Sequence, residues 1–334
     1  MTISGLGPHG ERAAPPERVN LLDSDRSAAR TEGWRVAVVL HTLDSDWAKH
    51  QLAGMIGIFG DCGVAVIDVV DCRFSVDRQI AALDRLIALA PDAIVSLPVA
   101  NAEVAAAHAR VSAAGCRLVL LDNAPTGLLP GKHYTALVSA DNFGLGKMAA
   151  AGLAPFLPQG AAVGVLGYAA DFFATNEREI AFTKWMQTHR PDLRTQVARF
   201  GRIDEAAPMA ARLVADHPDL AGLFIVWDTP AIAVAEQLAL TGHHLPLATV
   251  DLGELAAINL ARGDAVRCIA AQQPLQQGIA AAQTVILSLL GRPVPAWVAL
   301  SGLEVTRDNV VERFQTIWRQ PAPREVLRLL GLAD

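Results

Sequence analysis

Cysteine is scarce in this chain of 334 residues, which contains four. Cys62 and Cys72 flank the apolar run 64–70, which we predict to be one extended strand. A strand of that length separates its ends by roughly 30 Å, whereas a disulfide requires Cα atoms within about 7 Å of each other. Cys116 and Cys268 begin other apolar runs, where a small buried thiol is expected. The sequence therefore predicts neither a disulfide framework nor a cysteine metal site.

Positive charge and long apolar runs are limited as well. The chain has 28 Lys and Arg against 34 Asp and Glu, a formal net charge of −6, and no basic block. Nucleic-acid surfaces cluster Lys and Arg, so no nucleic-acid partner is expected. No run approaches the ~18 apolar residues of a membrane span. Residues 1–33 are polar, contain Pro and Gly and lack the features of a secretory signal, so we expect a disordered tail there.

Catalytic signatures are missing too. The G-x-G-x-x-G pattern at Gly5–Gly10 lies in the expected tail with no strand before it, so it does not indicate a dinucleotide site. The chain has no H-E-x-x-H and no G-x-S-x-G. His243 and His244 stand in a predicted loop, where solvation is the expected role. We predict no enzyme, no cofactor and no metal site.

Short β-rich runs that alternate with Ala-rich helical patterns are what the chain does contain. The apolar runs are 35–40, 64–70, 93–97 and 117–121, then 162–166, 195–200, 222–226 and 247–250. This alternation predicts βαβ units and parallel sheets. The order repeats: LVLLD at 118–122 corresponds to LATVD at 247–251, at a similar distance from the first strand of each series. We therefore predict an α/β fold of two similar doubly wound lobes.

Polar and aromatic side chains follow the predicted strands, at the edge where ligands bind in open parallel sheets. His41, Tyr168 and Asp228 stand at such ends. The candidate ligand-binding residues from the strand-end pattern are Thr42, Asp44, Trp47, Asp122, Asn123, Phe172, Asn176, Trp227 and Asp251. Ionised Asp accepts two hydroxyl hydrogen bonds, Asn both donates and accepts, and aromatic rings offer flat apolar faces. Such a set suits a small polyhydroxylated ligand.

Structural roles compete with ligand binding at several of these positions. Asp122 and Asp251 are also typical turn residues after strands. Trp47 is equally consistent with the core, and Asp228 with the start of a helix before Pro230. Phe172 and Phe173 cannot both face one side of an extended segment. These alternatives stay open on the sequence alone.

Five segments carry a family resemblance. They are Ser139–Lys147 (SADNFGLGK), Asn176–Phe182 (NEREIAF), Trp227–Ala231 (WDTPA), Ala271–Pro274 (AQQP) and Val305–Asn309 (VTRDN). In this order they resemble the type I periplasmic solute-binding proteins of the ribose-binding kind, over roughly Trp34–Trp318. The resemblance implies two lobes joined by three crossings that close on a ligand. It implies lobe one over 34–140 plus 273–300, lobe two over 141–272 plus 301–320, and a C-terminal extension over 321–334.

The resemblance also bears on the ligand. It matches Asp122, Asp251 and Gln272 to ligand contacts, and it retains Arg178 in a motif that can equally be structural. Asn123 and Asn176 stand where the ribose binder has Arg, and Trp227 replaces an Asn. These departures argue against ribose and, because cations that pair carboxylates are missing, against an acidic ligand. The expected ligand is a small neutral sugar or polyol.

The family implies a cellular role. It predicts a monomeric substrate-binding component of a sugar importer of the ATP-binding-cassette type, which works in the periplasm and docks on a membrane permease. The absence of a visible export signal leaves a cytoplasmic location open. Two alternatives share the architecture: the effector-binding part of a LacI-like regulator without its DNA-binding domain, and a sugar-sensing receptor for a chemoreceptor or kinase.

Overall fold

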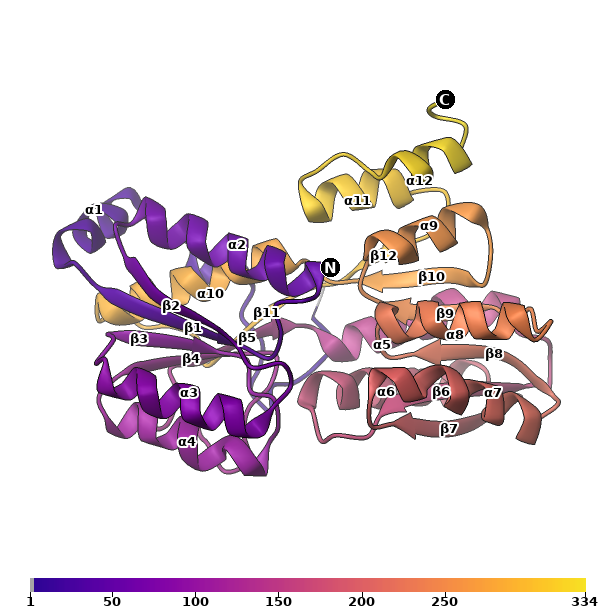
Figure 1. Ribbon diagram of the computed structural model, residues 1–334, viewed down its shortest axis with the longest axis horizontal. Coiled ribbons are helices and arrows are strands. Elements are labelled where there is room, and N and C mark those ends of the chain that lie inside the picture. The colour runs from indigo at the N-terminus through magenta and orange to yellow at the C-terminus, as the bar shows by residue number, and fades with distance from the viewer. Residues whose placement is uncertain (1–2) are drawn as a thin grey trace.

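The computed structural model describes residues 3–334, which form two α/β lobes side by side (Figure 1). Each lobe contains one six-stranded sheet, with strand orders β11-β5-β4-β3-β1-β2 and β12-β10-β9-β8-β6-β7. All pairings are parallel except that of β12 with β10, which is antiparallel. The prediction of two doubly wound lobes is confirmed.

Lobe one contains the N-terminal elements and a segment that returns late in the chain. Its strands are β1 (Arg35–Leu40), β2 (Ala65–Asp71), β3 (Ala93–Ser96), β4 (Arg117–Leu121), β5 (Ala136–Ala140) and β11 (Trp297–Leu300). Its helices are η1 (Pro16–Val19), α1 (Asp23–Glu32), α2 (Asp46–Asp61), α3 (Val76–Ala88), α4 (Ala102–Ala113) and α10 (Pro274–Leu289). Side chains of α1, α2 and α10 pack with the sheet in one core cluster, and those of α3 and α4 in another. Because helices cover both faces, β1 is buried at every position after Arg35.

Lobe two repeats the plan around a single core cluster. Its strands are β6 (Ala162–Tyr168), β7 (Arg194–Phe200), β8 (Leu220–Ile225), β9 (Leu247–Val250), β10 (Val266–Ala271) and β12 (Leu303–Val305). Its helices are α5 (Asn142–Leu153), η2 (Ala154–Phe156), α6 (Phe173–His189), η3 (Ile203–Glu205), α7 (Ala206–Asp216), α8 (Asp228–Leu240), α9 (Glu254–Arg262), α11 (Val310–Trp318) and α12 (Arg324–Leu329). None of the described helices is long and apolar enough to cross a membrane.

The chain passes between the lobes at three places that lie next to one another. These are the steps from β5 to α5, from β10 to α10, and from β11 to β12. At the first step the N–H of Asp141 donates to the carbonyl of Leu300 over 2.8 Å, which ties the first crossing to the third. The crossings bring the carboxyl ends of the parallel strands of both sheets toward the space between the lobes (Figure 1).

The N-terminal segment differs from the expected disordered tail. In the structure, η1 and α1 pack on lobe one through Val19, Leu21 and Ala29, and α1 ends at Gly33 in the left-handed conformation that a Cβ disfavours. Ala14 pairs with β11, and the N–H groups of Ser4 and Gly5 donate to the carboxylate of Asp141 over 2.6 and 3.0 Å. Few apolar residues suffice to order this segment because lobe one supplies the opposing surface.

Three further segments refine the sequence interpretation. Helix α6 begins at Phe173, so the segment Asn176–Phe182 lies wholly within it. The last strand ends at Val305, and residues 306–309 form a turn in which Asn309 accepts the N–H of Thr306. The expected C-terminal extension contains α12, whose Val326 is buried in the core of lobe two. All four cysteines are buried free thiols.

Candidate functional site

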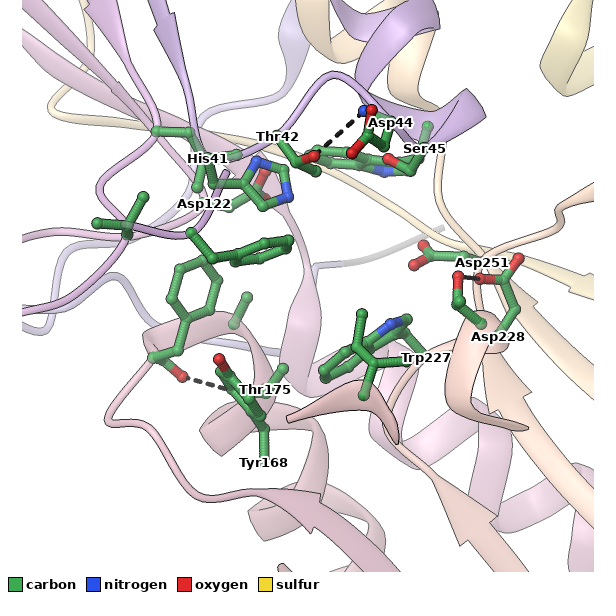
Figure 2. A pocket seen from close by; sticks show the side chains of 18 of the residues that line it. His41, Thr42, Asp44, Ser45, Asp122, Tyr168, Thr175, Trp227, Asp228 and Asp251 are labelled. Carbon is green, nitrogen blue, oxygen red and sulfur yellow. Dashed lines mark hydrogen bonds between the residues drawn. The ribbon is translucent and has the colours of Figure 1, made fainter. Parts of the chain in front are cut away.

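A cleft of about 470 Å³ lies between the lobes (Figure 2). Both sheets contribute the residues that follow their strands, as expected where carboxyl ends of parallel strands face each other. Of the residues proposed from the sequence, the cleft lining contains Thr42, Asp44, Trp47, Asp122, Phe172, Arg178, Trp227, Asp251 and Gln272. It also contains His41, Ser45, Arg73, Phe74, Leu97, Val99, Tyr168, Ala174, Thr175, Ile203, Asp228 and Thr229. The structure thus brings together side chains from both series of strands.

Asn123 and Asn176, both proposed from the sequence, lie outside this lining. Asn123 is fully buried and donates to the carbonyls of Pro98 and Ala100, while its side-chain oxygen accepts the N–H of Phe173 over 3.1 Å. It therefore joins lobe one to the start of α6 in lobe two. Asn176 lies on α6 and donates to the carboxylate of Asp171 at the surface. Neither amide group faces the cleft because each is used within the protein.

Asp122 and Asp251 occupy matching positions after β4 and β9. Both have left-handed backbones, with φ of 52° and 74°, which are uncommon outside glycine and cluster at functional sites. Asp122 is buried and accepts hydrogen bonds from Gln277 over 2.7 Å and from the N–H of Ala140 over 3.4 Å. Burial raises the pKa of Asp122 to about 6, although these donors and Arg178 oppose the shift. The same turn thus directs a carboxylate toward the space between the lobes from each side.

Arg178 is held by lobe two itself. Its guanidinium donates to the side chain of Asn142 and to the carbonyl of Val226, each over 2.9 Å. Helices α5 and α6 approach closely because residue 146 is glycine: a Cβ there would collide with the carbonyl oxygen of Arg178. Burial lowers the pKa of Arg178, while Asp251 and Asp122 favour its charged form. Arg178 therefore balances part of the negative charge of Asp122 and Asp251 while its guanidinium stays hydrogen-bonded to Asn142 and Val226.

Aromatic rings form two walls. In lobe one, His41 makes edge contacts with Trp47 at 5.8 Å and with Phe74 at 4.9 Å between ring centroids. In lobe two, Trp227 makes contacts with Tyr168 at 5.3 Å and Phe200 at 5.1 Å. Burial lowers the pKa of His41 to about 4, against the opposing effect of Asp71. At neutral pH the imidazole is therefore uncharged.

Three buried polar atoms along the cleft have no hydrogen-bond partner among residues 3–334. They are Nδ1 of His41, Nε1 of Trp47 and Oε1 of Gln272. The Nε2 of Gln272 donates to Oδ1 of Asp251 over 2.6 Å, which fixes the direction of its amide group. An unpartnered polar atom in a buried site costs about 1–3 kcal/mol, so such atoms favour a ligand that pairs with them. The cleft therefore offers both donors and acceptors to a polar molecule.

Comparison with known proteins supplies the family. The model of the periplasmic binding protein domain matches residues 36–293. The chain belongs to this family. No curated protein matches the chain in sequence.

Solved structures of binding proteins share the fold. An ABC transporter solute binding protein from Agrobacterium vitis, bound with alpha-D-tagatopyranose, is 20% identical with a TM-score of 0.78, covering 87% of this chain and 99% of its own. A carbohydrate transporter solute binding protein from Agrobacterium radiobacter, in complex with D-arabinose, is 19% identical with a TM-score of 0.76 and coverages of 86% and 99%. A second Agrobacterium vitis solute binding protein, with bound allitol, is 21% identical with a TM-score of 0.73 and coverages of 85% and 99%. At these identities the similarity establishes the shared fold.

Several lining residues of this periplasmic binding protein were not proposed from the sequence. Arg73 and Phe74 follow β2, Leu97 and Val99 follow β3, and Ile203 follows β7. The strand-end position is a signal common to all of them, but the four apolar side chains among them do not indicate hydroxyl recognition. Arg73 and Phe74 also have left-handed backbones, which bring the ring of Phe74 against His41. No local sequence pattern predicts that turn.

Asp228 begins a helix and also lies at the cleft. It is the first residue of α8, and its Oδ2 accepts the N–H of Gly253 over 2.7 Å, at the turn before α9. It also lines the cleft, on the same side as Asp251 and Trp227 (Figure 2). Burial, then the nearby Asp251, raises the pKa of Asp228. Lobe two thus presents a pair of interacting carboxylates.

Proposed function

We propose that this chain binds a small sugar or polyol between its lobes, as the substrate-binding component of a sugar importer of the ATP-binding-cassette type. The paired strand-end carboxylates Asp122 and Asp251 carry the proposal, because one from each lobe faces the same cleft. Carboxylates accept ligand hydroxyls through short charge-assisted bonds, and the rings of Trp47, Phe172 and Trp227 suit the apolar faces of a sugar. The tagatose, arabinose and allitol bound by proteins of the same fold support this class.

Binding proceeds by closure in this proposal. Thr42, Asp44, Trp47 and Asp122 of lobe one and Phe172, Arg178, Trp227, Asp251 and Gln272 of lobe two contact the ligand from opposite sides. A ligand that touches both lobes favours the closed arrangement by its differential contacts. Membership of the periplasmic binding protein family supports a periplasmic location and a membrane permease as the partner of the closed form. The chain acts as a monomer without nucleic acid, and no step of the function is catalytic.

A thermal-shift screen of ligand-free protein tests the proposal. The panel contains pentoses, hexoses and alditols, with acidic sugars and nucleotides as controls. A ligand at ~1,000 times its dissociation constant stabilises the folded state by about 4 kcal/mol, which corresponds to several degrees in Tm. We expect at least one polyhydroxylated compound to give such a shift, and Asp251→Ala to remove it. A shift confined to acidic compounds or nucleotides would reject the proposed ligand class.

A further inference from the structure

We propose that the sugar or polyol bound in this cleft carries a positively charged amino group, which lies beside Asp228 and Asp251. The inference rests on the proposed function and deepens it. The sequence departures argue against an acidic ligand, which led to the expectation of a neutral one. The arrangement of charged side chains in the folded protein favours a ligand that carries a positive charge.

The first observation is the distribution of charge where the cleft continues between α2, α8 and α9. A second cavity of about 480 Å³ shares Asp44, Trp47, Asp228 and Asp251 with the cleft. The carboxylates in its lining are Asp44, Asp46, Asp228, Glu236, Asp251 and Glu254. No Lys, Arg or His within residues 3–334 belongs to this lining. The region around Asp228 and Asp251 is therefore strongly negative.

Nearby cations offset this negative charge only in part, because Arg178 interacts with Asp251 and Asp228 from a fixed position and Lys49 pairs with Asp46 alone. Arg178 is bound to Asn142 and to the carbonyl of Val226. Arg73 is 67% exposed and pairs with Asp71 at 3.7 Å, and Lys49 pairs with Asp46 at 3.6 Å on the surface. Burial and the proximity of Asp251 raise the pKa of Asp228, and burial raises the pKa of Asp251, because the ionised forms lack sufficient compensation. A ligand cation would supply that compensation.

The second, independent observation is the amide of Gln272. The side chain is 3% exposed, its Nε2 is fixed on Asp251, and its Oε1 has no partner anywhere in the described chain. An ionised carboxylate only accepts hydrogen bonds, so this pairing leaves Oε1 directed away from Asp251 as a free acceptor. Oε1 of Gln272 therefore requires a donor, and the carboxylates of Asp251 and Asp228, which already accept from Gln272 and from Gly253 and Thr229, have lone pairs for further donors. An ammonium group offers three and has no acceptor that would be left unpaired.

Aromatic rings distinguish an organic cation from a metal ion. Trp47 and Trp227 line the cleft, and Trp318 lines the acidic cavity with Trp47. Tryptophan faces attract ammonium groups, most strongly where water is excluded. Within residues 3–334 no three His, Cys, Asp or Glu side chains are arranged to hold a metal ion. The carboxylates are thus placed around a larger, organic cation.

Calorimetric titration of the ligand-free chain with matched pairs tests this inference. D-glucosamine, D-galactosamine and D-mannosamine are compared with their parent hexoses and with their N-acetyl derivatives, which keep the nitrogen and lose its charge. Hydrogen bonds to charged groups are stronger than neutral ones, so at least one amine should bind about ten-fold or more tightly than its parent. N-acetylation should remove the gain. Asp228→Asn should reduce the preference, because asparagine retains the acceptor for Gly253 and removes the charge.

Asp216→Asn is the matched control, because it removes one negative charge at an exposed position of α7. It should leave the preference for the amine intact. Binding of the parent hexoses with equal or greater affinity than the amines overturns the inference while the proposed function stands. A preference that survives both Asp228→Asn and Asp251→Asn overturns the placement of the amino group. Failure of every amine and every parent hexose to bind overturns the inference alone when the thermal-shift screen finds another sugar or polyol, and the proposed function falls with it only when the whole screen fails.

Discussion

Asp122 shows how one residue can be unfavourable for the empty protein and useful for binding. Its backbone is left-handed, and its carboxylate is 3% exposed with Gln277 as its closest donor. Strained backbones of this kind cost of order 1–3 kcal/mol and persist where the surroundings fix them. Asp251 repeats the arrangement in lobe two with a different partner, Gln272. The two turns differ in the residue that donates to the carboxylate. What they share is the position of the carboxylate itself, which indicates that this position serves binding.

The charge of Asp122 has a pH-dependent effect on stability. Its pKa is about 6 in the folded protein against 3.8 for an ordinary Asp, so the folded state holds the proton more tightly than the unfolded chain. The stabilising contribution is complete below the lower value and is lost as the pH rises through the higher one. Asp122→Asn has no carboxylate to ionise. We expect it to raise the free energy of unfolding of the ligand-free protein by about 2–3 kcal/mol near pH 8, with little difference near pH 4.

Urea unfolding of the ligand-free chain at both pH values measures this effect. The exposed Asp216→Asn variant provides the control for a general change in net charge. An equal stability difference between Asp122→Asn and the native chain at the two pH values would contradict the explanation. In that case the effect of the substitution would arise from packing or hydrogen bonding rather than ionisation.

At the scale of single residues, position along a strand was more informative than residue type. Parallel strands bring their carboxyl ends to one edge, which is why Thr42, Asp122 and Asp251 could be assigned to the cleft from the sequence. Asn123 directly follows Asp122, yet the left-handed turn at Asp122 and the contacts of Asn123 with Pro98 and Phe173 place it elsewhere. Side-chain direction after such a turn depends on tertiary contacts that no local pattern contains.

Helices α5 and α6 are the elements that hold Arg178 in place. Their close approach requires the absence of a side chain at Gly146, because a Cβ there would meet the carbonyl oxygen of Arg178 and the Cβ of Ala181. We expect Gly146→Ala to lower the free energy of unfolding by about 1–3 kcal/mol through overpacking. Displacement of α6 should also weaken ligand binding, because Arg178 would leave its position opposite Asp122 and Asp251.

Gly57→Ala is the matched control for this substitution. Gly57 lies within α2, where an added Cβ would meet nothing within 4 Å. Alanine is a better helix former than glycine by about 1 kcal/mol, so Gly57→Ala should stabilise the protein. Thermal unfolding measures both variants, and titration with the ligand found in the screen measures their binding. Stabilisation by both alanines would show that α5 and α6 can separate without cost.

At the scale of elements, the sequence predicted the presence of most strands but was less accurate about where individual helices begin. Apolar runs identified most strands because buried strands of a parallel sheet need apolar residues on both faces. Helix α6 extends to Phe173 because its first turn packs on lobe one rather than on its own sheet: Phe172 and Phe173 contact the cores of lobe one. Helix α1 was missed for a related reason. Only Asp25 and Ala29 are buried on it, which is too little for a periodic signal.

The two lobes contact each other directly as well as through the three crossings. Trp47 packs against the cores of both lobes, and His50 of lobe one makes an edge contact with Trp318 of lobe two at 4.4 Å between ring centroids. On the other side, Asn123 accepts the N–H of Phe173. In the proposed closure mechanism, direct contact between the lobes therefore contributes alongside the ligand. The apparent affinity is set by both, since only the closed arrangement provides the complete site.

Asn123→Ala separates these two contributions. The substitution removes the acceptor of the Phe173 N–H without changing the lining of the cleft, so it should shift the ligand-free protein toward open arrangements. A lost buried hydrogen bond costs about 1–3 kcal/mol, part of which falls on contacts within lobe one, so we expect affinity to fall by roughly three- to thirty-fold. The fall should be the same for every compound that binds, because selectivity resides in the cleft. Asn176→Ala, which breaks only a surface bond with Asp171, should bind normally.

Small-angle X-ray scattering provides the second readout for Asn123→Ala. The ligand-free variant should have a larger radius of gyration than the ligand-free native chain, and saturation with ligand should bring the two to the same value. A weaker affinity without expansion would mean that Asn123 acts by supporting the loop at Pro98 and Ala100 within lobe one. Affinity losses that differ between compounds would instead mean that Asn123 contacts the ligand, as the sequence analysis proposed. The same comparison thus decides whether this asparagine recognises the ligand or holds the lobes together around it.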